Sequence, residues 1–146
     1  RQFRLLTTDD HPLRSVAIVA ALKRGEIVAL HGDRAIGRGD VPVPFLGGIA
    51  RFPAGALHLA AAGRAPIFQV FVVRERLGAY RFFSYPPQFV DKATLRQQPD
   101  APKRYATQYA ERLAEFVRQY PFQWYNIYPF WESTNTDSDP PNAPRP

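Results

Sequence analysis

Apolar residues recur at helical spacing in three parts of the chain. The first part lies between Pro12, which suits the first turn of a helix, and Gly25, which suits its end. The second covers residues 54–62. The third, residues 101–120, gathers tyrosine, leucine, phenylalanine and valine on one face and carries charged residues elsewhere, and Pro121 ends it. The pattern therefore predicts three helices.

Runs of β-branched and aromatic residues predict strands between these helices. Residues 26–31, Glu-Ile-Val-Ala-Leu-His, are an apolar run that predicts a buried strand. Residues 66–74 are rich in Phe and Val, and residues 77–79 predict a turn to a partner strand at 80–85. Residues 32–50 contain so many Gly and Pro residues that we predict a loop there.

This order of elements predicts an α/β fold. Alternating helices and strands indicate crossover connections, and the predicted hairpin makes the sheet mixed rather than purely parallel, with helices on both faces. We expect residues 1–131 to be part of one domain and the polar, Pro-rich residues 132–146 to be a disordered tail. Three strands make a small sheet with uncovered edges, which predicts that a further part of the protein completes it.

The composition fits a folded, basic domain. Hydrophobic residues make up 45% of the chain and aromatic residues 14%, which is enough for a packed core. The formal net charge is +6, and almost all of the cations are arginines, which suit bidentate contacts with phosphate or carboxylate. A basic surface attracts nucleic acid, anionic lipid or an acidic protein, and charge alone does not choose among them. No apolar run approaches the roughly 18 residues that span a bilayer, so we expect any membrane contact to be peripheral.

The common catalytic and cofactor motifs are absent from the sequence. The chain has no Cys, which excludes disulfides and thiolate zinc sites, and no two of its three histidines have a recognised metal-ligand spacing. No serine stands in a Gly-x-Ser-x-Gly elbow, and there is no P-loop. We therefore expect no metal and no cofactor.

The most suggestive polar residues lie between the first and second predicted helices. Asp33 and Arg34 follow the predicted strand 26–31, and α/β folds place ligand-binding groups beyond the carboxyl ends of their strands. Arg51 comes just before the second predicted helix, whose first N–H groups attract anions. Arg34 and Arg51 could therefore hold a phosphate. The alternative is that Asp33 and Arg34 form a local ion pair and that Phe52-Pro53 only fixes the entry to the helix.

The order of several short motifs resembles the bacterial lipid A biosynthesis acyltransferases, a branch of the lysophospholipid acyltransferase superfamily. The resemblance covers residues 13–131. The motifs are Leu-Lys-Arg-Gly-Glu-Ile-Val-Ala (22–29) before Asp33-Arg34, Val-Pro-Phe-Leu-Gly (43–47), Phe-Pro-Ala-Gly (52–55), Gly-Arg-Ala-Pro-Ile (63–67) and Pro-Phe-Gln-Trp-Tyr (121–125).

The resemblance implies transfer of a fatty acyl chain from acyl carrier protein, or another acyl thioester, to a hydroxyl of a lipid acceptor such as a lipid A precursor of lipopolysaccharide. In this family the general base is the histidine of a His-x4-Asp/Glu motif. Here the residues five positions after His11, His31 and His58 are not acidic, so the motif is missing. Because the chain also begins without Met, we interpret it as the C-terminal half of such an enzyme and expect it to be inactive alone.

The resemblance also suggests roles for individual residues. We predict that Asp33 supports the catalytic site and that Arg34 contacts an anionic group of the substrate. Arg51, Phe52, Pro53 and Gly55 are predicted to bind substrate, with Arg51 and the helix start at Pro53 holding its phosphate. The superfamily often has Glu where this chain has Ala54. Phe45, Leu46 and Phe52 either line the path of the lipid or pack in the core.

The aromatic residues between 122 and 131 suit either a bilayer interface or packing on the core. The first reading predicts a peripheral protein on the cytoplasmic face of the bacterial inner membrane. The main alternative to the enzyme is a non-catalytic basic module that binds anionic lipid or an acidic carrier protein. Nucleic-acid binding is not expected, because the interleaved aromatic and basic residues 80–83 lack any recognition motif around them.

Overall fold

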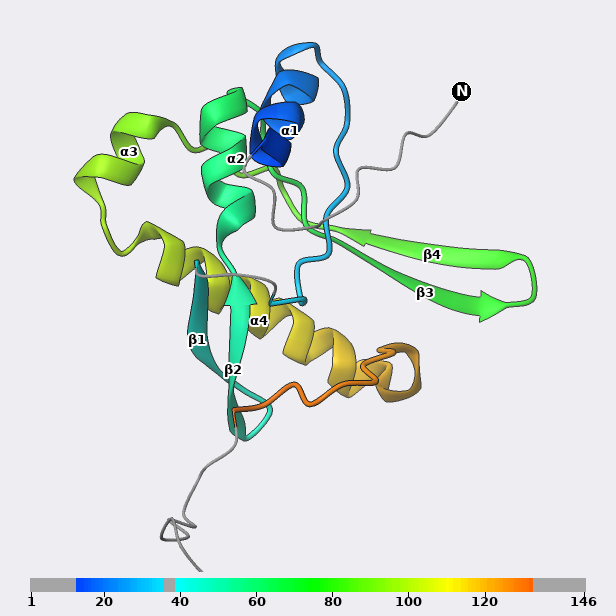
Figure 1. Cartoon of the computed structure of the whole chain (residues 1–146). Helices are drawn as coiled ribbons and strands as arrows, with labels where there is room; N and C mark the ends of the chain where they lie inside the picture. The colour runs from blue at the N-terminus through cyan, green and yellow to red at the C-terminus, as the bar shows by residue number, and fades with distance from the viewer. Residues whose placement is uncertain (1–12, 36–38, 133–146) are drawn as a thin grey trace, which may run out of the picture.

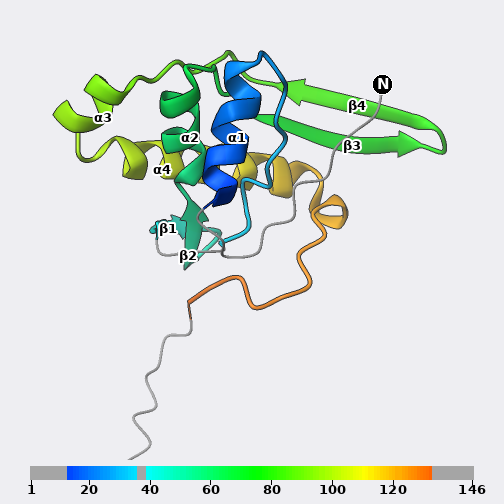
Figure 2. The same ribbon diagram turned by 45° about the horizontal axis from the view of Figure 1, so that its top comes forward.

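The computed structural model describes residues 13–35 and 39–132 (Figure 1). The predicted disordered tail, residues 132–146, therefore lies outside the described residues except for Glu132. Two helices, α1 (Leu13–Lys23) and α2 (Gly55–Gly63), lie side by side (Figure 2). They pack closely at Gly63, where an added Cβ would be 2.7 Å from the Leu22 Cβ. Both helices were predicted from their apolar spacing and their Gly ends.

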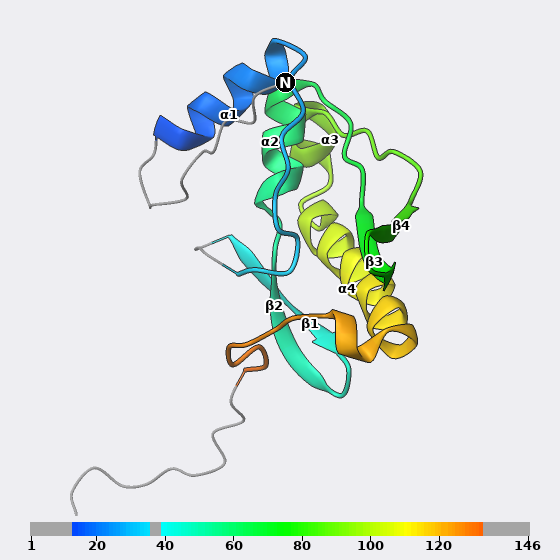
Figure 3. The same ribbon diagram turned by 90° about the vertical axis from the view of Figure 1, so that its right-hand side faces the viewer.

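The longest helix, α4 (Ala101–Gln119), runs through the middle of the molecule. It lies between the hairpin of β1 (Asp40–Phe45) and β2 (Gly48–Pro53) and the ribbon of β3 (Val70–Arg76) and β4 (Ala79–Ser84), as Figure 3 shows. Its predicted limits are confirmed to within one residue. The short helix α3 (Lys92–Gln97), which was not predicted, precedes it and is capped by the Asp91 side chain on Thr94 N.

The prediction of a loop throughout residues 32–50 is wrong, because β1 and the first half of β2 lie in it. The two strands pair antiparallel around a turn at Leu46-Gly47. Both turn residues have positive φ, 47° and 91°, as a two-residue hairpin of the I′ type requires. Pro42 and Pro44 point outward on β1 while Val43 and Phe45 are buried, so the prolines that suggested a loop stand in a strand.

The prediction of a buried strand at residues 26–31 is also wrong. The segment is extended, but none of it pairs with another described segment, and the Ile27 side chain is 98% exposed. An apolar run indicates side chains that favour burial. A strand also requires a second strand that forms hydrogen bonds with its backbone N–H and C=O groups.

The α/β class is confirmed, and its strands form two separate two-stranded antiparallel sheets. Within residues 13–35 and 39–132 no pair of strands is parallel, so the expected single mixed sheet is not what these residues form. The predicted hairpin with its turn at 77–79 is confirmed as β3 and β4, with β3 beginning later than predicted.

The core lies where α4 meets the β1–β2 hairpin and the inner side of β3. Small residues of α4 let the helix approach the sheets closely, and aromatic rings fill the remaining space. The core members are Val43, Phe45, Ala50, Phe52, Phe71, Ala106, Ala110, Leu113, Ala114, Val117 and Phe130. In contrast, the outer side of the β3–β4 ribbon, with Val72 and Phe82, remains exposed. No described helix is long and apolar enough to cross a membrane.

Candidate functional site

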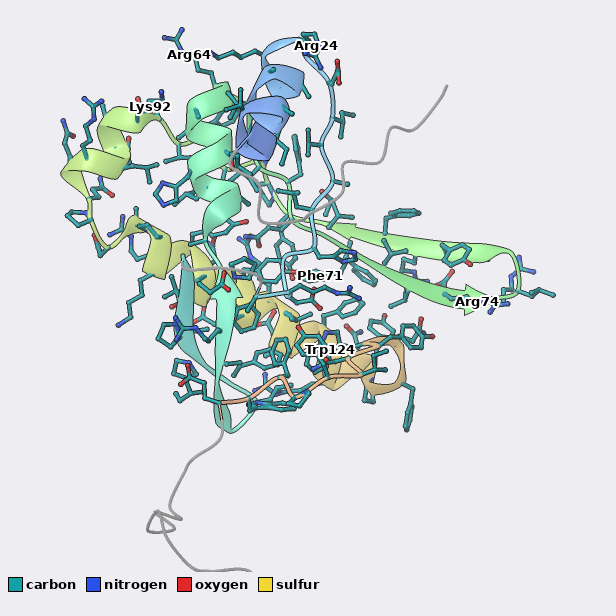
Figure 4. The ribbon with its side chains drawn as sticks, viewed as in Figure 1. Arg24, Arg64, Phe71, Arg74, Lys92 and Trp124 are labelled. Carbon is teal, nitrogen blue, oxygen red and sulfur yellow. The ribbon has the colours of Figure 1, made fainter. Side chains whose placement is uncertain are left out.

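Asp33 is half-buried and bonded to residues almost a hundred positions away. Its Oδ2 accepts a hydrogen bond from Trp124 Nε1 at 3.0 Å, and its backbone carbonyl accepts one from the Tyr128 hydroxyl at 2.9 Å. Figure 4 labels Trp124 beside the end of α4, in the segment that returns from that helix toward the β1–β2 hairpin. The carboxylate is therefore held from outside its own segment.

The close approach of this segment to α4 depends on Gly32. An added Cβ there would lie about 2.6 Å from the ring and hydroxyl of Tyr109. Glycine at 32 thus lets the backbone reach Tyr109 and brings Asp33 to the aromatic residues around it.

The charge of Asp33 acts on two of these aromatic residues. Burial raises the pKa of Tyr109 well above its usual value of 10.0, and the negative charge of Asp33 adds to the shift. Partial burial and Asp33 also raise the pKa of Tyr128, and Arg34 opposes them. Both phenols therefore remain neutral hydrogen-bond donors at neutral pH.

Arg34 is exposed beside this cluster. No ion pair within the described residues joins it to Asp33, whose carboxylate bonds instead to the Trp124 indole. The guanidinium of Arg34 is therefore available to an anionic group.

Arg51 has two bonds of its own. Nη1 lies 3.1 Å from Glu132 Oε1 in an ion pair, and Nη2 donates to the Asp40 carbonyl at 2.7 Å. Arg51 lies in β2, and α2 begins four residues later at Gly55. About half of the side chain is exposed, so an anion can reach it if Glu132 moves aside.

The other predicted substrate-binding residues differ in how exposed they are. Phe52 is fully buried and contacts Phe45, Tyr109 and Phe130 edge to face. Pro53 ends β2 and is half-buried, whereas Gly55 is exposed at the start of α2. No side chain caps that start and no acidic residue lies in its first turn, so its free N–H groups are available to an anion.

The C-terminal segment, residues 121–132, holds contacts that sequence reasoning missed. It crosses from the end of α4 back to the β1–β2 hairpin (Figure 3). Trp131 donates from Nε1 to the Phe45 carbonyl at 2.8 Å, and Glu132 N donates to the Ile49 carbonyl at 2.8 Å. The Pro-Phe-Gln-Trp motif at 121–124 was the one signal for this segment.

The aromatic residues of this segment divide between core and surface. Phe130 is buried and Trp124 packs against the core, whereas Phe122 and Tyr125 are 91% and 80% exposed. Core packing therefore accounts for Phe130 and Trp124, whereas Phe122 and Tyr125 are exposed as a bilayer interface would require.

The chain combines an α/β fold with a fixed carboxylate at Asp33, an exposed Arg34 beside it, and a partly exposed Arg51 that bonds to other residues. The family model described as bacterial lipid A biosynthesis acyltransferase matches residues 2–133, which is nearly the whole chain. The chain therefore belongs to the bacterial lipid A biosynthesis acyltransferase family, and the resemblance inferred from its motifs is confirmed. The comparison with curated proteins gave no match.

Proposed function

We propose that this chain takes part in moving a fatty acyl chain from acyl carrier protein, or another acyl thioester, to a hydroxyl of a lipid acceptor such as a lipid A precursor. The observation that carries the proposal is the family match over residues 2–133, which suggests acyltransferase activity. In the reaction the acceptor oxygen attacks the thioester carbonyl. A C–O bond forms, the C–S bond breaks, and the hydroxyl proton passes through a general base to the departing thiolate.

The general base of this reaction is not supplied by a His-x4-Asp/Glu motif in these 146 residues. A general base typically contributes about 100- to 10,000-fold to the rate. We therefore propose that the chain by itself is inactive and that it supplies substrate contacts and support for the catalytic site.

Two groups of residues are proposed for these roles. Asp33, fixed by Trp124, supports the catalytic site, and the exposed Arg34 beside it contacts an anionic group of the substrate. Arg51, together with the open helix start near Pro53 and Gly55, binds phosphate. Phe52 is fully buried, so its proposed role is to support Arg51 and the helix start by packing in the core.

Peripheral contact with the cytoplasmic face of the bacterial inner membrane is proposed from the exposed ends of the C-terminal segment. Phe122, Tyr125 and Ile127 project into solvent just after α4, and the chain has an excess of positive charge. Exposed aromatic rings settle at a bilayer interface, and basic residues are attracted to anionic lipids.

A second candidate function is a non-catalytic basic module that binds anionic lipid or an acidic carrier protein. The net charge of +6 and the missing motif favour it. The two functions differ in how they respond to loss of Asp33, because a binding module does not need a fixed carboxylate beside its cation.

The test uses the protein as its gene encodes it, with an acyl carrier protein thioester and a lipid A precursor. Asp33→Asn and Arg34→Ala should each lower turnover about 100-fold while the melting temperature stays within a few degrees. Exposed Arg96→Ala on α3 is the matched control. Normal turnover in both site variants would reject the site, and absence of any acyl transfer in the parent protein would favour the binding module.

A further inference from the structure

The placement of Asp33 depends on the C-terminal segment. Among the described residues, no backbone–backbone hydrogen bond involves any residue from Ile27 to Ala35. Neither a helix nor a sheet therefore fixes the main chain at Asp33. The bonds that hold it are those from Trp124 to its carboxylate and from Tyr128 to its carbonyl.

Trp124 is itself held firmly. Its ring meets Phe45 and Phe130 edge to face, with centroids 5.5 Å and 5.0 Å away. The neighbouring Gln123 is bonded to the backbone of Arg74 through both atoms of its amide group. The indole N–H thus projects from a packed position toward a carboxylate on a segment that has little support of its own.

We propose that Trp124 is the positioning residue for Asp33: its indole N–H fixes Oδ2 and leaves Oδ1 to serve the acyl-transfer site. This inference rests on the proposed role of Asp33. Within the described residues Oδ1 has no hydrogen-bond partner, so the carboxylate keeps an acceptor for a substrate or catalytic group. A misplacement of about 1 Å in such a group can cost on the order of 100-fold in rate.

The test compares variants of the protein as its gene encodes it. Trp124→Phe keeps a ring in the core and removes the N–H donor. It should lower kcat about 100-fold, as Asp33→Asn does, with KM changed little. The double variant Asp33→Asn/Trp124→Phe should be no slower than Asp33→Asn alone, because without the carboxylate of Asp33 the indole N–H has no catalytic group to position. Trp131→Phe, which removes a different indole bond, is the matched control and should retain normal turnover.

A purely structural role of Trp124 predicts a different result. It would lower the melting temperature of Trp124→Phe and leave kcat per folded molecule unchanged, and that outcome would overturn the inference. If Trp124→Phe does not fold, benzothienylalanine at position 124 keeps the shape of the indole without its N–H and gives the same comparison. Normal turnover of Asp33→Asn would instead reject the proposed role of Asp33, so the two failures are distinguishable.

Discussion

The side-chain amide of Gln123 forms two hydrogen bonds with the backbone of Arg74. Arg74 N donates to Gln123 Oε1 at 2.7 Å, and Gln123 Nε2 donates to the Arg74 carbonyl at 3.1 Å. One side chain thus makes the pair of bonds that a neighbouring strand would make with this residue of β3. These two bonds therefore fasten the edge of the β3–β4 ribbon to the segment that follows α4.

Replacing Gln123 by Leu should release the ribbon from the C-terminal segment. Each bond contributes about 0.5–1.5 kcal/mol, and the site is exposed, so we expect a loss of about 1–2 kcal/mol in the free energy of unfolding. Chemical denaturation measures the loss, and hydrogen exchange of the Arg74 amide should become faster. Gln119→Leu, on an exposed position of α4, is the control. An unchanged exchange rate would show that the two bonds do not hold the edge.

Gly48 lies directly under the Trp131 ring. A Cβ at position 48 would come within 3.0 Å of Trp131 Cδ1, so Gly48→Ala must displace the indole from the Phe45 carbonyl. We expect a loss of about 1–3 kcal/mol, as is usual for overpacking. Gly39→Ala, where an added Cβ meets nothing within 4 Å, should change stability by less than about 0.5 kcal/mol. If the two variants unfold at the same denaturant concentration, the Trp131 ring does not pack against Gly48 of the β1–β2 hairpin.

The helices and the β3–β4 turn were predictable because their signals are local. Apolar spacing and terminal Gly or Pro residues define α1, α2 and α4, and Gly78 with φ of 76° marks the turn. The β1–β2 hairpin was not predicted because Pro42 and Pro44 are loop signals unless they face the outside of a strand. Residues 26–31 form a strand only if a second segment pairs with them, and their own sequence does not show whether such a segment is present.

The candidate site was predictable in part. Asp33 and Arg34 stood out by their position after an apolar run, but the partner of Asp33 lies 91 residues away. No spacing rule connects Asp33 to Trp124, because the contact exists only once α4 and the C-terminal segment are in place. Arg51 was predicted to bind phosphate, and its ion pair with Glu132 likewise joins distant parts of the chain and could not be read from the sequence.

Stability should decline in alkaline solution because of Tyr109. Its pKa is raised in the folded state by burial and by Asp33, so the unfolded chain releases the proton first. The stabilisation is complete below about pH 10 and falls as the pH rises further, by up to about 1.4 kcal/mol per pH unit. Tyr109→Phe should flatten this decline in the free energy of unfolding. Tyr125→Phe, at an exposed ring, is the matched control, and an equally steep decline in Tyr109→Phe would contradict the assignment.

The purified chain should self-associate through its exposed apolar residues. Ile27 and Leu30 are 98% and 47% exposed in a segment without strand partners, and exposed apolar side chains promote association. Changing both to Lys should reduce the sedimentation coefficient toward that of a monomer and leave the free energy of unfolding within about 0.5 kcal/mol. Ala93→Lys/Gln97→Lys adds the same charge on the exposed side of α3 and should not have this effect. A parent chain that remains monomeric at every concentration would disprove the prediction.

The prolines of β1 decide where such association can begin. In a hairpin closed by Phe45 and Gly48, residues 42 and 44 occupy positions whose N–H groups would point away from β2. Proline has no N–H, so the outer edge of β1 offers carbonyls there without the donors that a new strand needs. The opposite edge, on β2, is occupied by Trp131 and Glu132. The hairpin is thus closed to growth on both sides, and intermolecular pairing must begin elsewhere in the chain, for example at the segment around Ile27.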